Sequence, residues 1–206
     1  MMKRVSIIAA SLFMITASLL SFGSSASAEG LSLGISANNR AVGTNASMLT
    51  SSPLGTLEVG AGLMYNEDRY TIGSGLVSVK SDNLTPGLRY GLGFKYVLGS
   101  MKNKAKTERA DLSALGFNLG AGYELPATIN PFNIPIEVTG DMTLAPESIT
   151  FDETKGYMDF TVGLRFYLIE NAYLTLTHTY IDAEFDTGNS WSRYINETMC
   201  GVVLTY

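Results

Sequence analysis

The stretch "LRYGLGFKYVL", Leu88 to Leu98, alternates large apolar side chains with small or charged ones. The large side chains at every second position are Leu88, Tyr90, Leu92, Phe94, Tyr96 and Leu98. Arg89, Gly91, Gly93 and Lys95 lie between them. Successive side chains of a β-strand point to opposite faces, so this alternation predicts a strand with one apolar and one polar face. The apolar face must then pack against either a protein core or a lipid bilayer.

The same alternation recurs in segments from Leu57 to the C-terminus, and turn-forming clusters separate them. We therefore predict eight firm strands, each of about ten residues, and no helix. Two further strands are expected if Leu31–Ile35 and Ala46–Thr50 pair with each other. Ten strands is the favoured count, and eight is the alternative if the segment before Leu57 is irregular.

The first residues have the order of a secretory signal peptide. A positive head at Lys3 and Arg4 precedes an uncharged apolar run, Val5–Phe22, and the small residues Ala26-Ser27-Ala28 follow it. We expect residues 1–28 to be removed and residues 29–206 to form one exported domain. The alternative is an anchor that stays attached, because the run approaches the length of a spanning helix.

Composition narrows the function classes. Without Lys3 and Arg4, twelve basic side chains face nineteen acidic ones, and this negative charge argues against nucleic acid as a partner. Cys200 is the single cysteine, so no internal disulfide can hold the exported domain together. No metal-spaced His/Cys set, nucleophile elbow or phosphate loop occurs, and we expect neither a cofactor nor a metal site.

The connections between predicted strands differ in length. Long polar connections are expected at Gly99–Asp111, Pro146–Gly156 and Glu184–Arg193, all at one end of the sheet, and shorter ones at the other end. Bacterial outer-membrane barrels have this asymmetry, and barrel closure satisfies the backbone without disulfides. We therefore predict an antiparallel up-and-down transmembrane β-barrel in the outer membrane of a Gram-negative envelope.

Aromatic residues fall on the apolar face toward the predicted strand ends, where rings suit the lipid headgroup region. Tyr206 has a second expected role, because a C-terminal aromatic residue is typical of chains that the outer-membrane assembly machinery recognises. The predicted girdle consists of Tyr65, Tyr96, Tyr123, Phe166, Tyr180 and Tyr206.

Two stretches, "LMYNEDRY" at Leu63–Tyr70 and "LAPESITFDETKGY" at Leu144–Tyr157, resemble the YfaZ family of small predicted outer-membrane proteins. The resemblance implies an outer-membrane barrel, and the family offers no defined activity to transfer. The chain departs from the family pattern at Asp141–Leu144, where tyrosines are usual, and at Thr177–Thr179, where a strand arginine is usual.

The polar face of the strands would line the lumen. Its charged side chains, together with glycines, predict an ion-paired network, which either fills a structural interior or leaves a narrow conduit for small solutes. The predicted lumen residues are Glu58, Arg89, Lys95, Glu124, Glu137, Asp141, Asp159 and Arg165.

Two other function classes remain open. A soluble exported β-barrel that binds a small apolar ligand would place Leu92, Phe94, Phe160 and Leu164 inside. An outer-membrane lipid hydrolase would depend on His178, the single histidine, although its position in the alternation places it toward lipid.

Two predicted loops could meet external partners. The loop containing Lys102, Lys104, Lys106 and Arg109 could contact lipopolysaccharide phosphates or be simply hydrated. Phe185 and Trp191, in the loop Glu184–Arg193, could bind an external partner.

Overall fold

The computed structural model describes residues 30–53, 55–105, 107–126, 128, 130 and 134–206. The predicted signal peptide and Lys106 lie outside these residues. Eleven antiparallel strands and one short 3-10 helix, η1, make up the described fold. The elements are β1 (Gly30–Ala37), β2 (Val42–Ser52), β3 (Gly55–Asn66), β4 (Tyr70–Thr85), β5 (Leu88–Lys102), β6 (Arg109–Glu124), β7 (Ile136–Ala145), η1 (Glu147–Ile149), β8 (Thr150–Phe151), β9 (Thr154–Ile169), β10 (Ala172–Asp186) and β11 (Ser190–Thr205).

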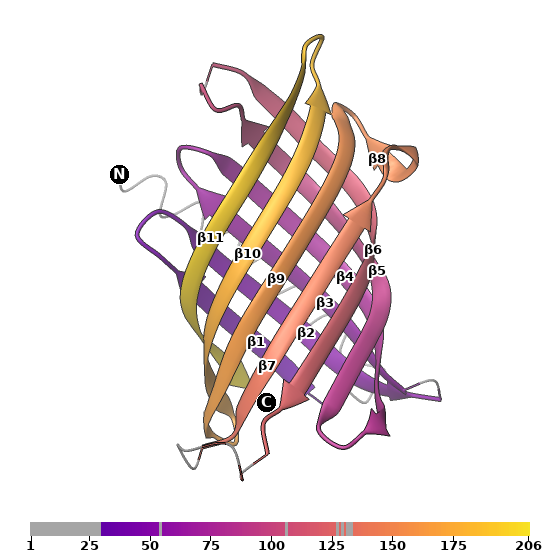
Figure 1. Ribbon diagram of the computed structural model, residues 1–206, viewed down its shortest axis with the longest axis vertical. Helices are drawn as coiled ribbons and strands as arrows, with labels where there is room; N and C mark the ends of the chain where they lie inside the picture. Colours follow the sequence, from indigo (N-terminus) through magenta and orange to yellow (C-terminus); the bar gives the residue numbers. More distant parts are fainter. Residues whose placement is uncertain (1–29, 54, 106, 127, 129, 131–133) are drawn as a thin grey trace.

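Ten of these strands close into a barrel (Figure 1). Each long strand pairs with its neighbour along the chain, and the sheet closes because β1 pairs with β11. The two-residue strand β8 adds only a short pairing to β6, beside the place where β7 ends. The prediction of an antiparallel up-and-down barrel with ten strands, including the two before Leu57, is confirmed.

The predicted length of about ten residues holds for β2, β3 and β7, but it is too short for the other long strands after β3. The strands β4, β6, β9 and β11 each have 16 residues. The alternation of side chains continues into segments that were predicted to be loops, so β5 and β6 leave only residues 103–108 between them. In the same way, β10 and β11 take most of Glu184–Arg193 and leave residues 187–189 as the turn.

Both ends of the folded chain, Gly30 and Thr205, lie at one end of the barrel, which we call the terminal end; the opposite end is the hairpin end. Tight turns at Pro86–Gly87 and Glu170–Asn171 lie at the terminal end, where Gly87 adopts a φ of 81°. The longest connection, residues 125–135, also lies there, contrary to the expectation of short connections only. Prolines such as Pro126 and Pro135 donate no backbone hydrogen bond, so they disfavour strand pairing in this segment.

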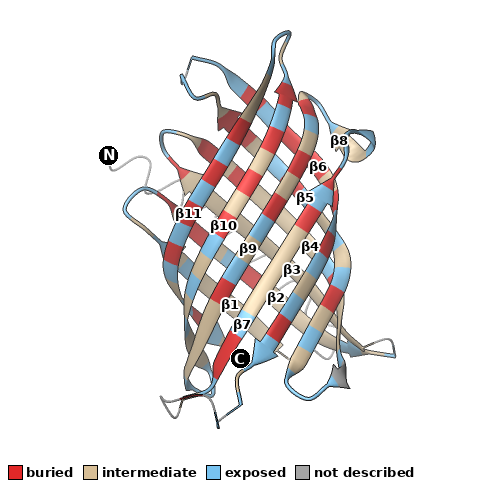
Figure 2. Cartoon of the chain, in the orientation of Figure 1, coloured by how far each residue is buried: buried red, intermediate tan, exposed pale blue. Residues whose placement is uncertain are grey.

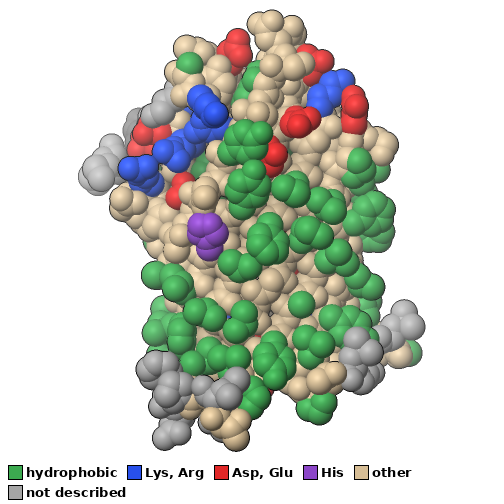
Figure 3. All heavy atoms as spheres, viewed as in Figure 1, with side chains coloured by type: hydrophobic (Ala, Val, Ile, Leu, Met, Phe, Trp, Pro, Cys, Tyr) green, Lys and Arg blue, Asp and Glu red, His purple; other side chains and the backbone are tan. Residues whose placement is uncertain are grey.

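The large apolar side chains face outward. Leu92 is 58% exposed, Phe94 53% and Phe160 44%, although a soluble barrel would bury them. Figure 3 shows the apolar side chains as a broad belt across the visible face of the barrel, with charged side chains gathered at the hairpin end. The alternative of a soluble barrel with an apolar ligand inside is therefore wrong. The described part of the chain contains no helix long and apolar enough to cross a membrane.

Candidate functional site

Apolar side chains fill the lumen near the hairpin end, and we call this group the plug. Its members are almost completely buried and come mainly from β4, β5, β6, β9, β10 and β11, with Ala145 at the end of β7 and Ala41 before β2, so the barrel wall itself supplies the filling. Figure 2 shows many buried positions in this half of the barrel, whereas most of β3 is only half-buried. The largest plug side chains are Tyr70, Ile72, Val97, Met101, Leu112, Tyr157, Ile181, Phe185, Ile195 and Met199.

Phe185 and Trp191 belong to this filling and not to an exposed loop. Their ring centroids are 4.6 Å apart, Phe185 is buried, and Trp191 packs against the plug. The expectation that they bind an external partner is wrong. Their strands continue through the predicted loop, and the alternation turns both rings into the lumen.

A polar cavity of about 260 Å³ lies next to the plug. Ile181 and Met199 of the plug line part of it, and hydroxyl and charged side chains line much of the remainder. Between this cavity and the terminal end, Arg89 keeps 48% of its side chain exposed, which indicates that solvent reaches the lumen from that side. The polar residues of the cavity include Ser36, Asn45, Ser74, Lys95, Thr139, Asp141, Asp159, Thr161, Arg165, Thr175, Thr177 and Thr179.

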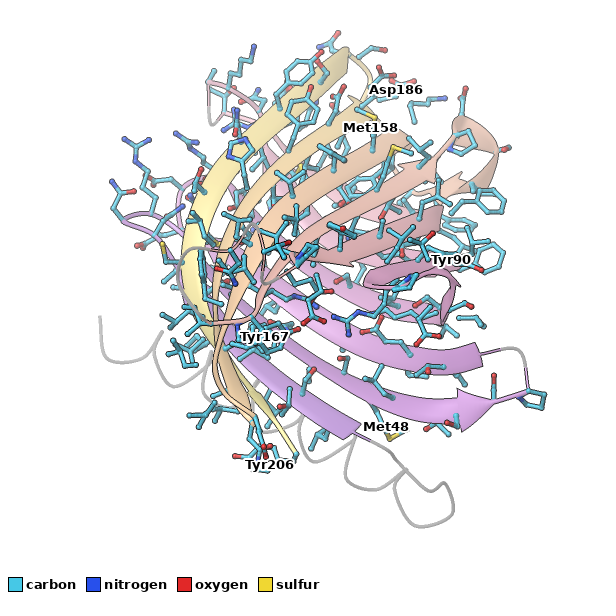
Figure 4. The ribbon with its side chains drawn as sticks, turned by 60° about the horizontal axis from the view of Figure 1, so that its bottom comes forward. Met48, Tyr90, Met158, Tyr167, Asp186 and Tyr206 are labelled. Carbon is cyan, nitrogen blue, oxygen red and sulfur yellow. The ribbon has the colours of Figure 1, made fainter. Side chains whose placement is uncertain are left out.

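Glu137 is the centre of the ion cluster nearest the terminal end. Its carboxylate lies 2.7 Å from the guanidinium of Arg89 and 3.2 Å from that of Arg165. The Tyr167 hydroxyl donates a hydrogen bond of 2.7 Å to the same carboxylate, and the Arg165 guanidinium stacks over the Tyr173 ring. Figure 4, which brings the terminal end forward, places Tyr167 at the inner wall near the opening at this end. One buried carboxylate thus links three strands, β5, β7 and β9.

A second ion pair lies deeper in the lumen. Lys95 of β5 donates a hydrogen bond of 2.7 Å to Asp159 of β9, and the Tyr157 hydroxyl donates one of 2.8 Å to the same carboxylate. Thr143 contacts the other carboxylate oxygen at 3.1 Å and accepts a hydrogen bond from Asn118. Because Asp159 is buried, these donors replace the water that its charge would otherwise need.

Glycines on the inner wall make room for neighbouring side chains. A Cβ on Gly120 would lie 2.8 Å from Oδ1 of Asp141, and one on Gly122 would lie 2.4 Å from Oε1 of Glu137. Across the strands, Gly91 pairs with Gly120, and Lys80 lies over Gly91 just as Asp141 lies over Gly120. The idea that these glycines leave open space for a conduit is therefore wrong at these positions.

Two other predicted lumen residues, Glu58 and Glu124, differ in their contacts. Glu58 forms an ion pair of 2.7 Å with Lys80, which is not among the predicted lumen residues. Glu124 is exposed near the terminal end and forms no ion pair among the described residues. Tyr167 is also absent from the predicted lumen residues. It lies two positions after Arg165 and therefore on the same inward face, so the alternation of the strand could have predicted its place in the lumen.

The predicted girdle residues all lie on the outward face, and Tyr96, Tyr123 and Tyr206 are exposed. Tyr65, Phe166 and Tyr180 are half-buried by their neighbours. Since β5 and β10 continue well beyond Tyr96 and Tyr180, these rings do not mark the strand ends. Tyr194, which was not selected, adds an outward ring 6.3 Å from that of Tyr180.

The basic segment between β5 and β6 is largely ordered by backbone pairing. Lys102 ends β5 and Arg109 begins β6, where its guanidinium donates a hydrogen bond to Ser100. Lys104 lies in the connection, with Nζ 5.7 Å from the centre of the Tyr194 ring. These contacts place Lys102, Lys104 and Arg109 at the rim of the hairpin end.

His178 is exposed on the outward face of β10 and is the purple residue of Figure 3. Its Nδ1 atom is 2.8 Å from the Thr198 hydroxyl. No carboxylate contacts His178 among the described residues, so a catalytic triad is not assembled there. The described residues also contain no group of three or more His, Cys, Asp or Glu side chains able to hold a metal.

Comparison with known proteins finds similarity of fold and no similarity of sequence. No family model matches the chain, and no curated protein matches it by sequence. Among solved structures, the KdgM porin is 8% identical, with 86% of this chain and 99% of that chain covered at a TM-score of 0.40. The NanC porin is 12% identical, with 85% and 98% covered at 0.41. CarO of Acinetobacter baumannii is 12% identical, with 87% and 97% covered at 0.22.

These structural neighbours are small outer-membrane β-barrel porins. Their identities and TM-scores are too low to carry an argument about what the chain binds or transports. The features that bear on function are therefore the outward apolar belt, the plug and the polar lumen of this barrel.

Proposed function

We propose that this chain is a small, porin-like outer-membrane barrel whose lumen is closed toward the outside by the apolar plug. The terminal end would face the periplasm, because an even number of strands puts both ends of the chain on the side from which it arrives. The hairpin end, with its charged rim, would face the exterior. The belt of outward leucine, valine and phenylalanine side chains supports this location.

The burial of the plug side chains is the observation that best supports a closed lumen. Val97, Met101 and Ile195 are each at most 1% exposed, although they point into the lumen. Small barrels have interiors that side chains can fill, and an apolar constriction resists wetting even where a narrow gap opens. The polar chamber on the periplasmic side would then admit water and small solutes without passing them through.

We further propose that the barrel has a structural role and no catalytic one, since His178 faces lipid and lacks a carboxylate partner among the described residues. Membership of the YfaZ family stays part of this proposal. So does recognition of β11, which leads to Tyr206, by the outer-membrane assembly machinery.

Conductance in planar bilayers tests the closed lumen. The refolded protein should give no stable conductance steps, whereas a variant with Met101→Ser, Leu112→Ser and Ile181→Ser should give them, because the plug loses bulk and gains polarity. Glu124→Gln, an exposed substitution away from the plug, should remain silent. Steady conductance by the unmodified protein would refute the closed state.

A further inference from the structure

The barrel wall has a notch at the hairpin end beside β11. The pairing of β1 with β11 stops at Ala37 and Cys200. Beyond Cys200, β11 continues to Ser190 and pairs only with β10 among the described strands. The wall is therefore lower over the β1–β2 hairpin, and lumen-facing residues in the outer part of β11 lie close to the outer surface.

Arg193 lies in this part of β11 without an anionic partner. Its residue is 7% exposed, its Nε atom is buried without a hydrogen bond, and no described carboxylate lies within ion-pair distance. Arg69 is near enough to add a repulsive positive charge. Burying a guanidinium is unfavourable unless an opposite charge compensates it, so this arrangement favours a bound anion.

The acidic side chain of β11, Glu197, already has other partners. It accepts a hydrogen bond of 2.8 Å from Asn38 and one of 3.5 Å from Asn66, and it lies 3.9 Å from Arg69. No ion pair joins it to Arg193 among the described residues.

Other cations surround the same rim. Lys102 donates its backbone N–H to the carbonyl of Arg69 at 2.9 Å, and Lys104 lies over the ring of Tyr194, which is on the outward face of β11. Figure 3 shows Lys and Arg side chains gathered at the hairpin end, immediately above the apolar belt. Lipid phosphates lie at this height in a bilayer, where tyrosines such as Tyr180 and Tyr194 are also favoured.

We propose that Arg193 and Arg69 form a binding site for the phosphate group of an anionic lipid in the outer leaflet. Arginine suits this role because its planar donors match the geometry of phosphate oxygens. The notch provides access from the leaflet, and the position above the belt favours a lipid headgroup over a free ion. This inference rests on the proposed orientation, with the hairpin end outside.

The test uses the full refolded barrel in neutral detergent and native mass spectrometry with diphosphoryl lipid A as the probe. We expect lipid A to bind in preference to phosphatidylcholine, and Arg193→Met to weaken lipid A binding about tenfold or more. Lys155→Gln is the matched control, because Lys155 is an exposed cation at the hairpin end with its own partner, Glu147, at 2.9 Å. It should change binding less than about threefold.

Arg193→Lys covers the case in which the methionine variant does not fold. It keeps the charge but loses the planar fork, so its affinity should fall between those of the unmodified protein and the methionine variant. Equal binding by all of these proteins, or no preference for lipid A, would overturn the site. Displacement of lipid A by millimolar inorganic phosphate would also overturn it in favour of a free-anion site.

Membrane recovery separates the two proposals. If Arg193→Met is recovered in the outer membrane with heat-modifiable gel mobility but binds lipid A normally, the lipid site is wrong and the barrel proposal stands. If the unmodified protein is recovered as a soluble periplasmic protein, the proposed function fails first.

Discussion

Lys95 and Asp159 join two strands of the barrel wall that are not paired with each other, with Nζ 2.7 Å from Oδ2. Their strands, β5 and β9, are not neighbours, because β6 and β7 lie between them. Lys95→Met leaves the buried Asp159 carboxylate without its cation, so we expect a loss of about 3–5 kcal/mol in the free energy of unfolding. Urea unfolding in lipid vesicles, followed by the fluorescence of Trp191, measures this loss.

The double variant Lys95→Met/Asp159→Asn should recover part of that stability, since no isolated charge remains. Glu124→Gln, at an exposed position, should change stability by less than about 0.5 kcal/mol. A loss in the double variant as large as the sum of the two single losses would show that the pair does not couple the strands.

Adjacent residues of β9 test the two faces of the wall. Phe160 points outward and Thr161 lines the polar cavity. Phe160→Arg should cost about 2–4 kcal/mol if the residue lies near the bilayer midplane, whereas Thr161→Arg should be better tolerated where the cavity has room. The heat-modifiable gel shift after refolding reports the folded fraction, and equal tolerance of both changes would contradict the assigned faces.

Two glycines of neighbouring strands provide a matched test of wall packing. A Cβ on Gly93 would lie 2.2 Å from the carbonyl oxygen of Val77, whereas a Cβ on Gly75 meets nothing within 4 Å. Gly93→Ala should therefore destabilise the barrel, because backbone must move. Gly75→Ala should be neutral or stabilise by up to about 1 kcal/mol through the unfolded chain. Urea midpoints that shift alike would contradict this account of backbone packing in the wall.

The period of the alternation made the barrel predictable from the sequence. Because every second residue points outward, "LRYGLGFKYVL" alone assigned Leu92 and Phe94 to one face and Lys95 to the other, and the structure has the same faces. The strand ends were less predictable. Glycine and charged residues at Gly99–Lys102 suggested a loop, but backbone pairing between β5 and β6 carries them as strand.

The partners inside the lumen depend on register across strands, which the order of residues does not state. Lys95 and Asp159 meet only because β5, β6, β7 and β9 take particular offsets. The plug was missed for a related reason. Val97, Met101 and Ile195 are apolar residues on the polar face, and only closure of the barrel shows that they meet one another in its centre.

Cys200 offers the most direct test of the central claim, that the apolar face of this barrel meets lipid. It is the single cysteine and is exposed on the outward face of β11. A nitroxide label there, in reconstituted vesicles, should collide often with dissolved oxygen and rarely with a water-soluble nickel chelate. With Cys200→Ser, a label at Thr177→Cys, inside the polar cavity, should show greater access to the chelate. Free access of the chelate to the label at Cys200, with protection at position 177, would contradict the account.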